Sequence, residues 1–130
     1  MNFQGGPYDT ILMLGHGIGM VENIKGLSRF LDHAIKLISI NGQLIISSVD
    51  VSKTDIHLRY HEQNRCKGRY IGETRVQFKY KEEQGPFCGW LHIDPKTLQK
   101  IFNLKNWKCN VIYEDKSGEY SACITYKGTV

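Results

Sequence analysis

The first fifty residues contain two short apolar runs separated by a segment with helical spacing. Residues 11–14 form an apolar run of strand length that ends at a glycine-rich turn. Apolar side chains in residues 24–38 recur mostly at steps of three and four, which places them on one face of a helix. The pair Asn41-Gly42 predicts a turn, and residues 43–49 form a second apolar, β-branched run. This order predicts a β-α-β unit whose two strands lie parallel in one sheet.

The middle of the chain changes from a polar, aperiodic stretch to regular alternation. The polar stretch predicts a loop with a short helical turn over residues 55–63. Apolar and polar positions then alternate over residues 69–80 and return over residues 87–93, on either side of a turn at residues 82–86. We therefore expect residues 51–93 to form a loop and a β-hairpin insertion.

The last third of the chain predicts one helix and two strands. Asp94 followed by Pro95 is typical of a helix start, because aspartate caps free backbone N–H groups and proline fits the first turn. Residues 107–114 and 120–126 are strand-like, and residues 116–118 form the turn between them. The predicted fold class is therefore α/β, with an antiparallel C-terminal hairpin completing the sheet.

Composition adds little to this picture. A length of 130 residues predicts a single domain over residues 1–130, and the hydrophobic share of 41% and charged share of 23% are ordinary for a globular chain. We find neither a signal-peptide pattern nor an apolar run of the roughly eighteen residues that a membrane span needs. The four cysteines are widely spaced, which is typical of free thiols in a reducing compartment. These features predict a cytoplasmic protein.

Residues 8–50 read YDTILMLGHGIGMVENIKGLSRFLDHAIKLISINGQLIISSVD. This segment resembles the fourth strand, following helix and fifth strand of class I S-adenosylmethionine-dependent methyltransferases, one bacterial branch of which carries a similar Asp-Thr, Asn-Gly-Ile-Gly and Gly-Gln. The hairpin, the helix after Asp94 and the last two strands resemble the remainder of that fold. The resemblance implies the C-terminal half of a Rossmann-like methyltransferase sheet that lacks the first three strands, with S-adenosylmethionine as the family's cofactor.

The resemblance also implies which parts of a cofactor site this chain does not carry. In the family, a glycine-rich loop after the first strand holds the cofactor's methionine part, and an acidic residue after the second strand holds the ribose. Both lie outside the matching portion, so we expect a truncated, methyltransferase-like chain that is inactive as an isolated monomer. Residues after the family's fourth strand lie near the methyl group and the substrate. By position these are Gly15, His16 and Gly17.

An alternative reading makes the chain a small S-adenosylmethionine-binding protein. Here Gly15, His16, Gly17 and Gly19 form the cofactor loop itself, because glycines allow a tight turn and a close approach to the ligand, and Asp50 binds the ribose. Three features oppose this reading. The helix is long, Asp50 lies well beyond the usual offset of about 20 residues, and the strand before the loop ends in apolar residues rather than an acidic one.

Two further sets of residues suggest other chemistry. His57 and His61 have the spacing of two ligands on one helix face, but solvated loop histidines are the commoner case, and we predict no metal site. The predicted hairpin combines aromatic residues with Arg75, Lys79 and Lys81, so a nucleic-acid-binding module is a second alternative. Such aromatic side chains more often pack on a core or on a partner subunit.

The predicted topology leaves part of the sheet uncovered. In family terms the strands are ordered fourth, fifth, seventh, sixth, and the handedness of crossover connections places both helices on one face. The other face would be bare, and residues 11–14 would form an apolar edge strand, which is a template for pairing with another chain. We therefore expect a homodimer, or a complementary chain that covers the exposed face and edge.

Overall fold

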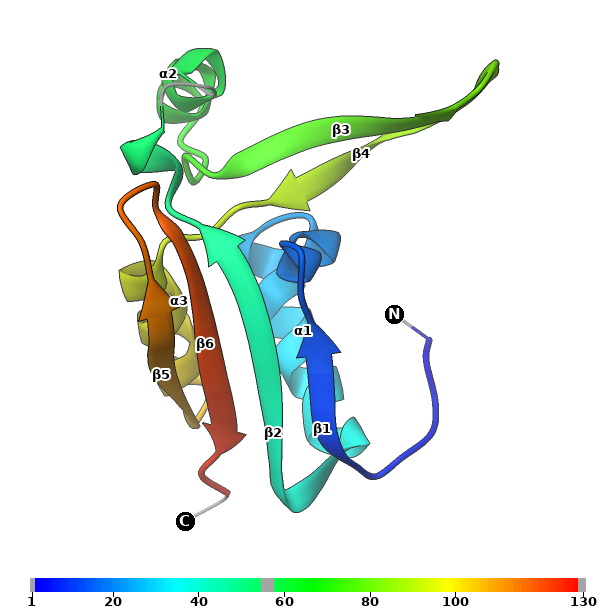
Figure 1. The fold of residues 1–130 in the computed structure, drawn as a ribbon, viewed down its shortest axis with the longest axis vertical. Helices are drawn as coiled ribbons and strands as arrows, with labels where there is room; N and C mark the ends of the chain where they lie inside the picture. The colour runs from blue at the N-terminus through cyan, green and yellow to red at the C-terminus, as the bar shows by residue number, and fades with distance from the viewer. Residues whose placement is uncertain (1, 55–57, 129–130) are drawn as a thin grey trace.

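The structure contains a four-stranded sheet and a separate two-stranded hairpin. Figure 1 shows the long helices behind the sheet and the hairpin projecting from one end. The computed structural model describes residues 2–54 and 58–128, without the side chains of residues 58–60. In chain order the elements are β1 (Tyr8–Met13), η1 (Gly17–Val21), α1 (Ile24–Leu37), β2 (Ile38–Val49), η2 (Val51–Lys53), α2 (Leu58–Cys66), β3 (Glu73–Tyr80), β4 (Glu83–Leu91), α3 (Pro95–Leu104), β5 (Trp107–Glu114) and β6 (Glu119–Tyr126), where η marks a 3₁₀ helix.

The sheet has the strand order β1-β2-β6-β5. Strands β1 and β2 are parallel, whereas β6 runs antiparallel to both β2 and β5. This confirms the predicted β-α-β unit, the fourth-fifth-seventh-sixth order and the antiparallel C-terminal hairpin. Strands β3 and β4 form a separate two-stranded sheet. Because β1 is the first strand in the order, one of its sides is an edge of the described sheet.

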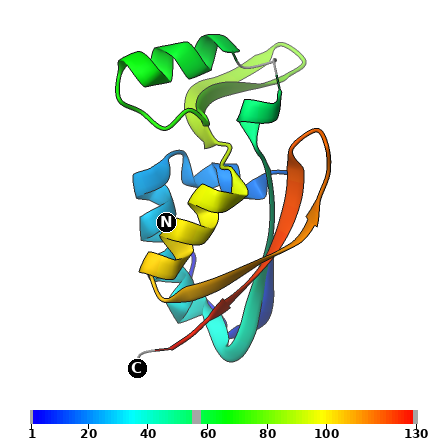
Figure 2. The ribbon, with the colours of Figure 1, turned by 90° about the vertical axis from the view of Figure 1, so that its left-hand side faces the viewer.

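Both long helices pack on the same face of the sheet, as predicted (Figure 2). Helix α1 buries Leu27, Phe30, Leu31 and Ala34 against this face, and α3 buries Leu98 and Phe102. At the lower end of the core, the buried Trp107 ring lies 6.3 Å from Phe102 and 5.0 Å from Tyr126. No described helix is long and apolar enough to cross a membrane.

Each long helix begins at a capping side chain. The Asn23 side chain accepts a hydrogen bond from the backbone N–H of Gly26 at 2.8 Å. The Asp94 carboxylate accepts one from the N–H of Thr97 at 3.0 Å, and Pro95 occupies the first turn of α3. These bonds satisfy backbone donors that have no partner inside the helix, so the sequence-based start of α3 is confirmed.

Two predicted boundaries were wrong, whereas the turn predicted at residues 41–42 is present as a bulge in β2. Strand β2 starts directly after α1, but β1 advances only from Tyr8 to Thr10 while its partner on β2 advances from Ile38 to Gln43, so the chain bends over residues 39–42. A Cβ on Gly42 would approach the Asp9 carbonyl to 3.0 Å. The hairpin turn is not at residues 82–86 but at residues 81–82, with Lys81 in the left-handed region at φ 55. The helical turn predicted at 55–63 corresponds to helix α2, which spans Leu58–Cys66 and so ends three residues later than predicted; residues 55–57 lie outside the described part.

The face opposite the helices carries a mixed surface. Leu12, Ile45 and Cys123 lie opposite one another on β1, β2 and β6, and their row continues to Asn110 on β5. Leu12 is 61% exposed, and Leu14, just after β1, is 55% exposed. Within the described residues no helix lies over this face (Figure 2). We refer to Leu12, Leu14, Ile45 and Cys123 as the open face.

Three buried acidic groups make the fold sensitive to alkaline pH. Burial and the neighbouring Cys123 raise the pKa of Cys109 to about 11. Burial, and for Tyr70 also its hydrogen bond to Asp94, holds the pKa of Tyr70 and Tyr120 well above the usual tyrosine range. In the unfolded chain these groups lose their protons at about pH 8.5 for cysteine and about pH 10 for tyrosine.

We therefore expect stability to fall as the pH rises above about 8.5, because the unfolded state then binds fewer protons than the folded state. Urea unfolding followed by circular dichroism between neutral pH and pH 11 measures this as a falling midpoint. Cys109→Ala should weaken the decline at its lower end, where the tyrosines are still protonated in both states. A midpoint that stays constant up to pH 11 would contradict the prediction.

Candidate functional site

The carboxyl ends of the parallel strands β1 and β2 lie together and carry a histidine–carboxylate pair. The chain leaves β1 through residues 14–16, and His16 adopts a left-handed backbone conformation with φ 60. Its backbone N–H donates to the Ser47 hydroxyl on β2 at 3.1 Å. Its Nε2 lies 2.6 Å from Oε2 of Glu119 at the start of β6. The His92 ring lies edge-on at a centroid distance of 5.5 Å.

This arrangement suits proton transfer. When the carboxylate of Glu119 accepts the Nε2 proton of His16, the neutral imidazole presents Nδ1 as a proton acceptor. Both side chains are partly exposed, at 29% for His16 and 42% for Glu119, so a ligand can reach them. Ligands of open α/β sheets bind outside the carboxyl ends of the strands, which is where this pair lies. The pair is thus a candidate general base.

Two backbone N–H groups of the predicted cofactor loop donate hydrogen bonds to carbonyl groups of the same loop. The N–H of Gly17 donates to the Leu14 carbonyl at 3.0 Å, and the N–H of Gly19 donates to the His16 carbonyl at 2.9 Å. A Cβ on Gly19 would lie 2.1 Å from Nε1 of Trp90, so this glycine makes room for the indole of β4. Of the three loop glycines, only Gly15 borders open space, because a Cβ there would meet nothing within 4 Å.

Asp50 lies at the end of β2, as the ribose-binding hypothesis required, but its carboxylate has another role. Oδ1 accepts hydrogen bonds from the backbone N–H of Ser52 at 3.0 Å and from its hydroxyl at 2.6 Å, which begins η2. The donors of the glycine loop and the acceptor of Asp50 are thus engaged within the chain. These contacts give Gly17, Gly19 and Asp50 a structural role and do not favour a cofactor cradle, so the cofactor site at this loop stays a prediction.

Sequence reasoning missed Glu119 and Ser47. Neither belongs to a motif, and Glu119 is far from His16 in the chain. One signal was available, because the predicted sheet places β6 beside β2, and Glu119 is opposite Val49 in the observed register. Of the predicted hairpin aromatics, Phe78 and Tyr80 on β3 and Phe87 on β4 are exposed, at 63%, 70% and 59%, whereas Tyr70 and Trp90 are partly buried. The exposed rings leave the nucleic-acid alternative as a prediction that salt-dependent RNA binding can test.

The structure gives no support to a metal site. His61 is buried on α2, and its predicted companion His57 lies outside the described residues. Among the residues that the structure describes, no three His, Cys, Asp or Glu side chains gather in a way that could hold a metal ion.

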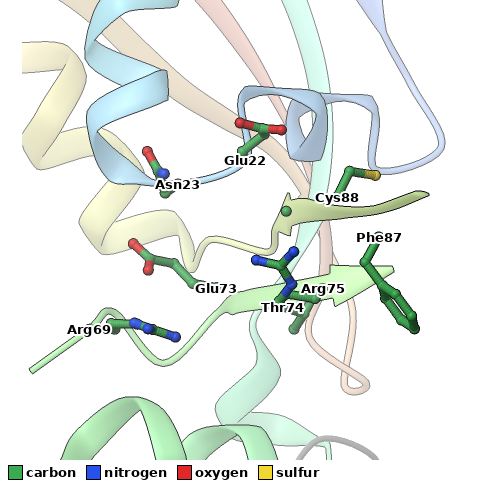
Figure 3. A pocket seen from close by; sticks show the side chains of 9 residues that line it. Glu22, Asn23, Arg69, Glu73, Thr74, Arg75, Phe87 and Cys88 are labelled. Carbon is green, nitrogen blue, oxygen red and sulfur yellow. The ribbon is translucent and has the colours of Figure 1, made fainter. Parts of the chain in front are cut away.

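A hollow separate from the His16–Glu119 pair lies between the start of α1 and the base of the hairpin (Figure 3). Its volume is about 420 Å³. Glu22 and Asn23 border it on the side of η1 and α1, and Arg69, Glu73 and Arg75 border it on the side of β3. Its lining is therefore polar and carries charges of both signs.

Comparisons with known proteins place this architecture in a larger fold. Neither family models nor curated protein sequences give a match. A solved structure of an S-adenosylmethionine-dependent methyltransferase from Bacteroides fragilis, in complex with S-adenosyl-L-homocysteine, superposes with a TM-score of 0.75 and 27% identity, over 92% of this chain and 48% of that chain.

More distant methyltransferases show the same fold. A structure from Methanosarcina mazei has a TM-score of 0.59 at 12% identity, and covers 95% of this chain and 60% of its own. One from Clostridium acetobutylicum has a TM-score of 0.57 at 8% identity, and covers 98% of this chain and 61% of its own. The chain thus spans 48% to 61% of the length of these three structures. It has the fold of the C-terminal half of a class I S-adenosylmethionine-dependent methyltransferase.

Proposed function

We propose that this chain forms the acceptor side of an S-adenosylmethionine-dependent methyltransferase and that the cofactor side is supplied by a polypeptide segment outside these 130 residues. The observation that carries the proposal is the edge position of β1. Its sequence is that of a buried strand, yet one side of it is unpaired in the described sheet. The likeness to half of a structure that binds S-adenosyl-L-homocysteine supplies the reaction class.

The residues of this chain contribute a base rather than a cofactor site. The cofactor, when bound, supplies the methyl group, and it does so from the part of the fold that this chain does not carry. His16 is placed to take the proton of an acceptor's hydroxyl or amine at Nδ1, while Glu119 holds the opposite nitrogen. An isolated monomer is therefore inactive in methyl transfer.

The open face and the free edge of β1 are both surfaces that a second polypeptide would cover. On its own, the chain is expected to form a homodimer through these surfaces, because an exposed apolar edge strand readily pairs with a second copy. A complementary chain with the cofactor half would compete for the same surface. The partner that occupies the open face and the β1 edge would then determine whether the chain can take part in catalysis.

Calorimetric titration with S-adenosyl-L-homocysteine tests the proposal. The chain by itself should give no heat at micromolar ligand. A mixture with the half of the Bacteroides fragilis methyltransferase that this chain does not match should bind. Micromolar binding by the lone chain would instead establish the glycine-loop alternative, provided that Asp50→Asn abolishes it. Asp9→Asn is the matched control, because Asp9 lies near the start of β1, at the end of the sheet away from the glycine loop.

A further inference from the structure

The hollow between the start of α1 and the hairpin presents opposite charges to one volume. In Figure 3 the Glu22 and Asn23 side chains lie on one side, and Arg69, Glu73 and Arg75 lie on the other. The Phe87 ring borders one end. The hollow measures about 420 Å³, which is room for a small molecule rather than a polymer.

Three of these charges are not neutralised by one another. Among the ion pairs of the described residues, none includes Glu22, Glu73 or Arg69. The Glu73 carboxylate accepts a long hydrogen bond of 3.5 Å from the N–H of Ile24. A guanidinium and two carboxylates therefore border the same space with their charges available to a ligand.

The position of Glu22 is built into the backbone. Glu22 ends η1 with φ 76 and ψ −47, a conformation that residues with a side chain rarely adopt. Gly89 on β4 permits this approach, because a Cβ there would lie 3.0 Å from the Cβ of Glu22. Strained residues of this kind cluster at ligand sites, where the surrounding structure maintains them. A merely solvated surface glutamate would need neither the conformation nor the glycine.

We propose that this hollow binds a small zwitterion that carries one carboxylate and one ammonium group. Guanidinium groups bind carboxylates in a planar, bidentate manner, so Arg69 would take the anionic end. Glu22 and Glu73 would take the ammonium end, and the face of Phe87 accommodates an apolar or aromatic substituent.

The proposed function gives this ligand a role, and this step rests on it. His16 caps the start of η1 and Glu22 caps its end. At the 3₁₀ rise of about 2 Å per residue, the two caps lie within about 12 Å of each other. A hydroxyl group on the substituent of an amino-acid-like molecule held at Glu22 would then be the methyl acceptor: its oxygen would gain the methyl group, its proton would pass to Nδ1 of His16, and the demethylated cofactor would leave.

Nuclear magnetic resonance titration of the full chain tests the site without cofactor or partner. L-phenylalanine is the zwitterionic probe, while 3-phenylpropanoate and 2-phenylethylamine each lack one charge. We expect phenylalanine to shift the amide signals of Glu22, Arg69 and Glu73, with a dissociation constant at least about tenfold lower than that of either single-charge analogue.

Glu22→Gln and Arg69→Gln should each weaken phenylalanine binding by about tenfold or more. Lys79→Gln, on the same hairpin but outside the hollow, should leave it unchanged. Equal affinity for the three probes, or shifts confined to other parts of the chain, would overturn the proposal. Since no cofactor is present, this outcome is independent of the titration that tests the methyltransferase role.

Discussion

Replacing Leu12 with aspartate is expected to convert the proposed homodimer into a monomer. Leu12 lies at the margin of the open face, on the edge strand β1, with Ile45 beside it on β2. A carboxylate buried at such an interface without a partner costs about 3 kcal/mol or more. The dimer dissociation constant should then rise on the order of 100-fold. Size-exclusion chromatography with light scattering at micromolar concentration measures the change.

Leu104→Asp provides the matched control. Leu104 is 78% exposed at the end of α3, on the helical side of the sheet, so the same substitution there should leave the dimer intact. A wild-type chain that is already monomeric at micromolar concentration would refute the homodimer. Dissociation by both substitutions would place the interface elsewhere.

Gly19→Ala is expected to destabilise the fold by about 3 kcal/mol, at the upper end of the cost of overfilling a packed site. The added methyl would lie 2.1 to 2.5 Å from three atoms of the Trp90 indole. The indole must move, and with it the contact between the hairpin and η1. Urea unfolding by circular dichroism at one protein concentration measures the loss, and the fluorescence of Trp90 should shift as its ring becomes more exposed.

Gly17→Ala in the same loop separates packing from cofactor binding. A Cβ on Gly17 would lie 3.4 Å from the Cβ of Met13, an ordinary contact. Its backbone is not in the left-handed region that favours glycine, so the substitution should be neutral or stabilising by up to about 1 kcal/mol. If both substitutions left stability unchanged, the role of Gly19 as a seat for Trp90 would be wrong.

The sheet could be predicted because its signals are local. The apolar runs of β1 and β2, the stripe on α1 and the Asp94-Pro95 helix start each depend on neighbouring residues, and handed crossovers then fix the helical face. The start of β2 at Ile38 could not be predicted, because Asn41-Gly42 signals a turn and regular pairing with β1 resumes only at Gln43. The pairing of Ile38 with Tyr8, before the bulge at residues 39–42, is visible only in three dimensions.

The site was less predictable because it depends on contacts between distant segments. The glycine spacing suggested a ligand loop, but Gly19 is required by Trp90 on another strand. The partner of His16 could be found only from the register of β6 beside β2. The positive φ of Glu22 could not be predicted from the sequence. The glycine that permits it, Gly89, is distant in the chain and lies against Glu22 only in the folded structure.

The β3–β4 hairpin extends past the β1 edge in Figure 1. Its aromatic side chains Phe78, Tyr80 and Phe87 are exposed. A strand added alongside β1 would therefore arrive beneath this overhang rather than at an unobstructed border. Pairing along β1 would then also bring the added strand under the hairpin, next to the carboxyl ends of the strands. A chain too bulky to fit below the hairpin could not pair with β1.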